Sequence, residues 1–154
     1  MKFSGQLAVA APRNEVFDRI RDARFFASCI NGVTNLEEIG ADKYSALFET
    51  KVAFMKFKFQ VEVEVTKAER PDLIEGKIEG KPIGIVGRLN ATSSTTLIER
   101  GGETVISYDV EANLTGKLGS LGQPVLNAKA KDMEKQFMAN LRASFGLDGQ
   151  GTSA

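Results

Sequence analysis

The residues from Phe57 to Thr66 alternate strictly between apolar and polar side chains. In an extended chain, successive side chains point to opposite faces, so this pattern is typical of a strand with one buried and one solvated face. Further runs alternate in the same way, at 44–54, 73–80, 83–91 and 104–114. Together with a first strand at about 2–10, the pattern predicts six to seven strands.

Short clusters that contain glycine or proline separate these runs, at 40–42, 70–72, 80–82 and 101–103. Such residues favour tight turns, because glycine accepts positive φ angles and proline fixes its own φ. Since short turns then connect neighbouring strands, we expect an antiparallel meander with one face in water and the other face covered.

Helical periodicity replaces this alternation in two parts of the chain. Pro12 suits the first turn of a helix with an apolar stripe, and a second short helix is expected over 24–29. Near the other end, apolar residues recur three or four positions apart and predict a long helix over about 117–146. These residues are Leu126, Ala130, Met133, Phe137, Leu141 and Phe145.

The order of these elements predicts an α+β fold in which a curved antiparallel sheet wraps around a long C-terminal helix, with two short helices after the first strand. A chain of 154 residues is most simply one domain. We expect this domain to span residues 1–147, followed by a small, polar and disordered tail at 148–154.

Composition and charge narrow the classes of function. The 20 basic and 20 acidic residues cancel, which removes the usual electrostatic argument for a nucleic-acid partner. Histidine is absent, so Ser-His-Asp and Cys-His nucleophilic sites and histidine-based zinc sites are excluded. The lone Cys29 lies among apolar residues and is expected to be buried and inert. We therefore expect no catalytic residue, no metal site and no cofactor.

The amino-acid sequence also indicates the cellular compartment of the protein. The N-terminal segment MKFSGQLAVAAP is too short and too polar for a signal peptide, and no window approaches the roughly 20 apolar residues of a membrane span. A single cysteine allows no intrachain disulfide, which favours a reducing compartment. A cytoplasmic protein is expected.

Gly116, Gly119 and Gly122 lie between a predicted strand and a predicted helix, where a phosphate-binding loop would occur. Their spacing fits neither the Walker loop nor the dinucleotide fingerprint, so we expect no nucleotide site. Two interpretations stay open. The glycines either allow close packing of helix on sheet, or they weaken the start of the helix so that it gates a cavity whose mouth lies near the loop 29–33.

A cavity is expected because one helix cannot cover the whole sheet. The inward side chains are nearly all apolar, so the buried part of a ligand should be apolar and uncharged. The expected ligand-binding residues are Phe48, Val52, Phe54, Phe57, Phe59, Val61, Ile78, Ile85, Leu89, Tyr108, Val110, Leu118, Leu121, Val125, Met133 and Phe137. Of these, Leu118 and Leu121 are expected to form an apolar lip at the mouth.

Three motifs occur in this order of elements. They are Ala11-Pro12-Arg13 with Val16-Phe17, then Cys29-Ile30-Asn31-Gly32 followed by Leu36-Glu37-Glu38-Ile39-Gly40, and finally Gly116-Lys117-Leu118-Gly119-Ser120-Leu121-Gly122. With the alternating strand at 57–65, they make residues 1–145 resemble the carbon monoxide dehydrogenase G-subunit family, within the START and Bet v 1-like helix-grip superfamily. There are two departures: Asn31 stands where this family usually has proline, and Pro124 interrupts the start of the last helix.

The resemblance implies a non-catalytic protein with a hydrophobic cavity for a quinone or a lipid. It also implies a role beside a molybdenum-containing carbon monoxide dehydrogenase or related hydroxylase, in coupling that enzyme to the inner face of the cell membrane by peripheral contact. Two alternatives stay open. Polyketide cyclase- or hydratase-like enzymes share the fold but place polar residues inside the cavity, where only Thr50 and Tyr108 are expected here. An assembly factor would need no ligand.

Overall fold

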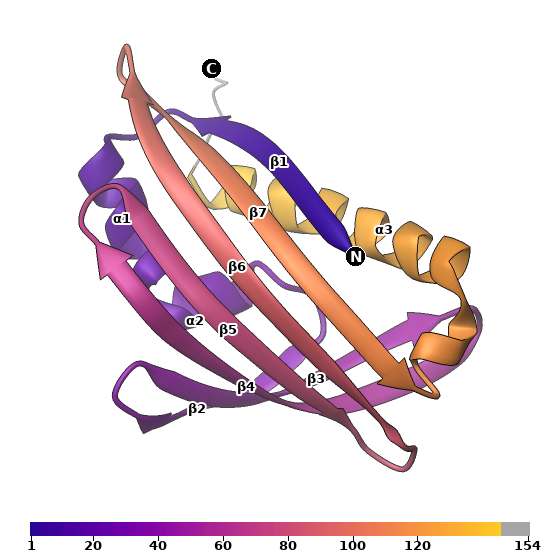
Figure 1. Cartoon of the computed structure of the whole chain (residues 1–154). Coiled ribbons are helices and arrows are strands. Elements are labelled where there is room, and N and C mark those ends of the chain that lie inside the picture. Colours follow the sequence, from indigo (N-terminus) through magenta and orange to yellow (C-terminus); the bar gives the residue numbers. More distant parts are fainter. Residues whose placement is uncertain (146–154) are drawn as a thin grey trace.

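The computed structural model describes residues 1–145, and Figure 1 shows one antiparallel sheet backed by helices. The sheet has seven strands in the order β1-β7-β6-β5-β4-β3-β2. They are β1 (Lys2–Val9), β2 (Val33–Gly40), β3 (Lys43–Val52), β4 (Met55–Glu69), β5 (Leu73–Pro82), β6 (Gly87–Arg100) and β7 (Glu103–Gly116). The predicted α+β class and antiparallel sheet are confirmed. The tail predicted at 148–154 lies outside the described residues.

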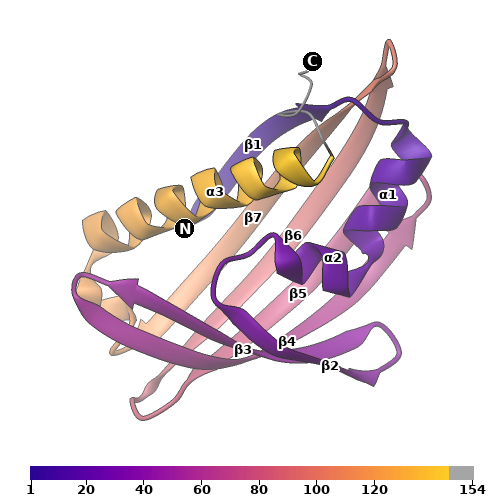
Figure 2. The same cartoon turned by 180° about the vertical axis from the view of Figure 1, so that it is seen from behind.

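The helices lie on one side of this sheet. After β1 come α1 (Arg13–Arg21) and α2 (Ala23–Ser28), and after β7 come the short 3-10 helix η1 (Gly119–Leu121) and the long α3 (Gln123–Ser144). Figure 2 shows α3 running across the sheet, with α1 and α2 beside its C-terminal end. The side covered by the helices is called the inner face below. The two short helices after the first strand were predicted and are confirmed.

The last helix begins later than predicted, at Gln123 instead of 117. Gly122 has a φ of 92°, which cannot continue a helix and separates η1 from α3. Pro124 then occupies the first turn of α3, where a backbone N–H has no helical partner to lose. Pro124 therefore starts the helix and does not interrupt it.

Two hairpin turns also differ from the prediction. β3 ends at Val52, and the two-residue turn Ala53–Phe54 has positive φ angles of 50° and 72°. The turn predicted at 80–82 is wrong, because β5 pairs with β4 as far as Pro82. The true turn covers residues 83–86, and β6 starts at Gly87.

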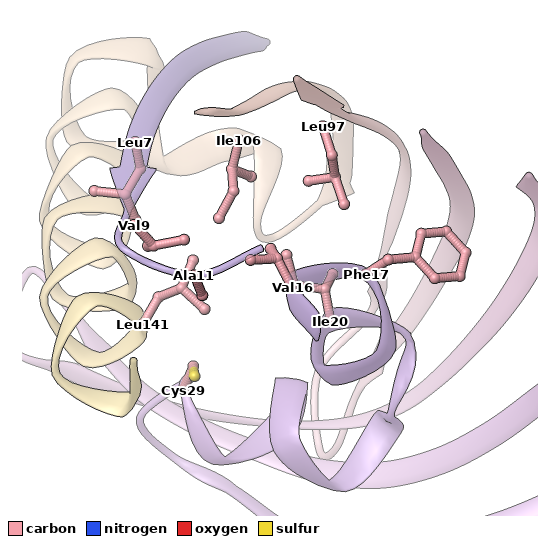
Figure 3. Close-up of a cluster of buried hydrophobic side chains, with 10 residues drawn as sticks. All are labelled: Leu7, Val9, Ala11, Val16, Phe17, Ile20, Cys29, Leu97, Ile106 and Leu141. Carbon is pink, nitrogen blue, oxygen red and sulfur yellow. The ribbon is translucent and has the colours of Figure 1, made fainter. Parts of the chain in front are cut away.

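The core is divided into two clusters of buried apolar side chains. The first, called the α1 cluster, joins the start of the chain to the end of α3 (Figure 3). Its members are Leu7, Val9, Ala11, Val16, Phe17, Ile20, Cys29, Leu97, Ile106 and Leu141. The second, called the hairpin cluster, lies where α3 begins and consists of Val52, Phe57, Phe59 and Leu118.

Candidate ligand-binding site

The middle of α3 is less tightly packed than its ends. Of its 22 residues only Leu126, near the start, and Leu141, near the end, are buried. The side chains between them that turn toward the sheet are half-buried. The helix is therefore held at its two ends, by the hairpin cluster and the α1 cluster, and stands away from the sheet in between.

The inner face of the sheet shows the same gap from the opposite side. Val65, Gly76, Ser93, Val110 and Phe3 are register partners and form one row across five strands. All five are half-buried, although they belong to the face that the helices cover. Solvent thus reaches the inner face between the two clusters, and this space, bounded by the row and by the middle of α3, is the candidate ligand site.

One polar pair bridges this space. The Tyr108 hydroxyl on β7 donates a hydrogen bond to the Glu134 carboxylate on α3, and it lies 3.8 Å from the sulfur of Met138. Burial raises the pKa of the Tyr108 phenol above its ordinary value, and the hydrogen bond to Glu134 and the charge of Glu134 raise it further. The phenol therefore stays protonated and can donate to a carbonyl oxygen, while the carboxylate can accept from a hydroxyl.

A small pocket of about 130 Å³ opens where the loop after α2 meets α3 and β3. It is lined by Ile30, Asn31, Gly32, Glu49, Thr50, Lys129, Met133 and Gln136. Asn31 donates to the side-chain oxygen of Gln136 at 2.6 Å, and Asn140 donates to Asn31 at 3.1 Å and to the carbonyl of Cys29 at 2.9 Å. Asn31 and Asn140 thus tie this loop to α3.

A larger hollow, of about 550 Å³, is lined by residues of β1 and β4–β7, including Phe3, Gly76, Ser93 and Val110 of the row. Its lining consists mainly of outward side chains of both charges, among them Lys2, Glu75, Lys77, Asp109 and Glu111. Such a surface is solvated and offers little apolar area, so it does not suit an apolar ligand. The space under α3 is therefore the better candidate, although the pocket beside it, at the loop after α2, is smaller.

The predicted site residues gather mostly around the hairpin cluster. Val52, Phe57, Phe59 and Leu118 are its buried members. Phe48, Val61, Ile85, Leu121 and Val125 are half-buried and pack against it. Because the four members are closed off in this conformation, contact between them and a ligand stays a prediction that requires this cluster to open. Leu118 in particular is only 2% exposed, so it does not form a lip here.

The remaining predicted residues lie elsewhere. Ile78, Leu89, Tyr108 and Val110 are half-buried on the inner face, and Met133 and Phe137 are half-buried on α3. The Phe137 ring packs against that of Phe26 with centroids 5.4 Å apart. The expectation that Phe54 points inward is wrong: it lies in the β3–β4 turn and is fully exposed.

Sequence reasoning missed several residues of the inner space. Val63, Val65, Ser93 and Thr95 belong to the inner face but were not among the expected ligand contacts. Glu134 was missed because it is charged, yet it follows Ala130 by four positions and precedes Phe137 by three. That helical spacing is the signal that places it beside the apolar stripe.

The glycines before α3 have identifiable packing roles. A Cβ at Gly119 would come within 2.8 Å of the Leu114 carbonyl oxygen, and Gly122 has its positive φ. An alanine at either position would therefore be strained, and replacing both would disturb the fold as well as stiffen the turn. The glycine at position 119 thus allows the turn to pack closely against β7. It does not serve the packing of α3 against the sheet.

Comparison with known proteins agrees with this architecture. Over residues 5–146 the chain matches the CoxG family, described as the G subunit of carbon monoxide dehydrogenase. Among solved structures, a conserved protein from Geobacillus kaustophilus is 26% identical, with 95% of each chain covered and a TM-score of 0.85. No curated protein matches the sequence.

More distant structures share the fold alone. A START superfamily protein from Mycobacterium smegmatis is 9% identical, covers 94% of this chain and 96% of its own, and has a TM-score of 0.70. The Zhui aromatase/cyclase from Streptomyces sp. R1128 is 13% identical, with 99% and 96% covered and a TM-score of 0.64. No helix within residues 1–145 is long and apolar enough to cross a membrane. The fold is START/Bet v 1-like, and the chain belongs to the carbon monoxide dehydrogenase G-subunit (CoxG) family.

Proposed function

We propose that this protein is a non-catalytic carrier that holds a quinone or a lipid between the sheet and the middle of α3. The observation that carries the proposal is the row of half-buried inner-face residues under a helix that is buried only at its two ends. Contact between water and the apolar side chains of this space is unfavourable, so an apolar ligand that displaces the water lowers the free energy. The pair of Tyr108 and Glu134 offers one polar contact to the head of such a ligand.

The family supports a role as an accessory protein of a carbon monoxide dehydrogenase. We propose that the partner is a molybdenum-containing enzyme of this type or a related hydroxylase, and that the carrier couples it to the membrane. A quinone held in the inner space would then accept electrons or be exchanged with the bilayer. This part of the proposal rests on the family and on the apolar site together.

The ligand is tested by extracting the purified protein with organic solvent and identifying bound molecules by mass spectrometry. Ile78→Trp would place a large side chain in the inner space, and Lys77→Trp would place the same side chain on the outer face of β5. The inner variant should lose the ligand and the outer variant should keep it. The chain has no natural tryptophan, so indole fluorescence also reports whether each new side chain is buried.

A cyclase- or hydratase-like enzyme is the second candidate, favoured by the one observation that Tyr108 and Glu134 face the inner space. A protonated phenol beside a carboxylate can perform general acid–base chemistry on a bound carbonyl compound. Glu134→Gln separates the two functions. An enzyme would lose turnover by roughly 10²–10⁴-fold, whereas a carrier would retain its extractable ligand.

A further inference from the structure

Apolar side chains project into solvent at one end of the molecule. Phe54 is fully exposed and Val86 is 80% exposed, and Met55 and Ile83 are about half exposed. They occupy the tips of the β3–β4 and β5–β6 hairpins. Figures 1 and 2 both show these two tips at the end of the molecule where η1 and α3 begin. Residues 51–58, 81–88 and 115–121 are called the hairpin end below.

Backbone hydrogen bonds hold the parts of this end together. The Ile83 amide donates to the Lys58 carbonyl at 2.8 Å, which fixes the second hairpin against β4. The Lys117 amide donates to the Val86 carbonyl at 2.9 Å, which fixes the same hairpin against the segment before η1. The exposed apolar side chains therefore stand on one continuous piece of structure.

The charge of the hairpin end is entirely positive. It contains six basic residues and no acidic one, although basic and acidic residues are balanced in the whole chain. The six are Lys51, Lys56, Lys58, Lys81, Arg88 and Lys117. None of them takes part in an ion pair within residues 1–145, although Glu49 is the register partner of Lys58. This end thus attracts anions while it exposes apolar side chains.

One pairing within this end is unfavourable for the isolated protein. Lys51 and Lys56 are direct cross-strand partners in the β3–β4 ladder, and both are exposed. Like charges placed directly opposite each other destabilise a sheet. A dense array of negative charge outside the hairpin would offset this repulsion.

We propose that the hairpin end docks on the surface of a bilayer that contains anionic lipids. The basic residues would contact the headgroup phosphates, and Phe54 and Val86 would enter the boundary between headgroups and acyl chains. A fluid surface suits apolar side chains that stand on two separate tips, because it needs no complementary shape. Docking would also hold the start of α3, and with it the proposed mouth of the site, against the bilayer.

This inference rests on the proposed coupling to the membrane and deepens it by naming the surface that docks, and this docking needs no ligand in the inner space. The experiment is sedimentation of the full chain with vesicles of phosphatidylcholine alone and of phosphatidylcholine with phosphatidylglycerol. Binding should require phosphatidylglycerol and should fall as salt rises, since exposed charges are screened. Phe54→Ser should weaken binding several-fold, and the matched control Ile98→Ser, 49% exposed at the other end of β6, should not.

Lys56→Glu gives the sharpest result, because docking should weaken while the stability of the fold is not reduced. It should weaken vesicle binding about tenfold or more, given roughly fivefold per basic residue near an anionic surface, while the unfolding midpoint stays equal or rises. Lys135→Glu on α3 makes the same change in net charge and should leave binding nearly intact. Equal losses in these two variants, or equal binding to both kinds of vesicle, would overturn the proposal.

The vesicle experiment also separates this proposal from the carrier function. Ile78→Trp should bind vesicles like the natural chain even when it has lost its extractable ligand. If the natural chain binds no anionic vesicle at low salt, the docking proposal fails, and an acidic protein surface becomes the partner that these cations fit.

Discussion

The packing between Gly5 and Tyr108 predicts an unusual response to a single methyl group. Gly5 on β1 is the direct register partner of Tyr108 on β7, and it is not among the residues with positive φ. An alanine can therefore adopt its backbone conformation. A Cβ at this position, however, would come within 2.6 Å of Cζ of the Tyr108 ring. The ring lies over the glycine, and its hydroxyl is held by Glu134.

Two opposing effects set the magnitude for Gly5→Ala. Replacing glycine by alanine stabilises a protein by about 0.4–1 kcal/mol where the backbone permits it, because the unfolded chain loses entropy. Forcing a methyl group into a packed contact costs about 1–3 kcal/mol. The contact should win, because the ring cannot move away without breaking its bond to Glu134, and the net loss should be about 1–2 kcal/mol.

The assay is equilibrium unfolding in urea, in the natural background and in a Tyr108→Ala background. With a slope of about 2 kcal/mol/M, the natural background should lose about 0.5–1 M in its midpoint. In the Tyr108→Ala background the same methyl group meets no ring, so Gly5→Ala should be neutral or slightly stabilising. An equal loss in both backgrounds would show that the ring does not restrict this position.

The site leads to three further predictions. Burial and the bond to Glu134 raise the pKa of Tyr108, so the folded state holds this proton more tightly than the unfolded chain does. The contribution of this group to stability should therefore be fully present below pH 10, the ordinary pKa, and should decline as the pH rises above it. In the variant Tyr44→Phe, Tyr108 is the one remaining tyrosine. The phenolate absorbance of this variant should rise at a higher pH in the folded protein than in the protein unfolded in urea. The affinity for a quinone analogue should barely depend on salt, since the inner face is mostly apolar, and a steep loss with salt would indicate an anionic ligand. Finally, if the start of α3 gates the site, amides at 116–123 should exchange faster than those at 133–141, and equal protection would exclude the gate.

The faces of the strands could be predicted from sequence, whereas two of the turns could not. Alternation in β4 assigns Phe57 and Phe59 to the buried side, as the structure confirms. The β3–β4 turn was missed because two-residue hairpin turns with positive φ normally carry asparagine or glycine. Here Ala53 and Phe54 occupy it, so the alternating pattern continues past the true end of β3.

The depth of burial along the inner face could not be predicted from the sequence either. Alternation assigns Val110 and Ile106 to the same side of β7, yet Ile106 is 3% exposed and Val110 is half-buried. The difference depends on how far α3 stands from the sheet at each point, which the clusters at its two ends determine. Those contacts join residues more than a hundred positions apart, such as Leu7 and Leu141, and no local pattern encodes them.

The placement of Cys29 gives the molecule an internal reporter. Its side chain is fully buried in the α1 cluster, its carbonyl accepts from Asn140, and its sulfur lies 3.9 Å from the Ser144 hydroxyl oxygen. A thiol reagent can reach this sulfur only while the loop after α2 and the last turns of α3 are apart. Because the chain has no other cysteine, alkylation reports on Cys29 alone. The alkylation rate of the folded protein, divided by the alkylation rate of the unfolded chain, gives the fraction of time for which this end of the helix is released.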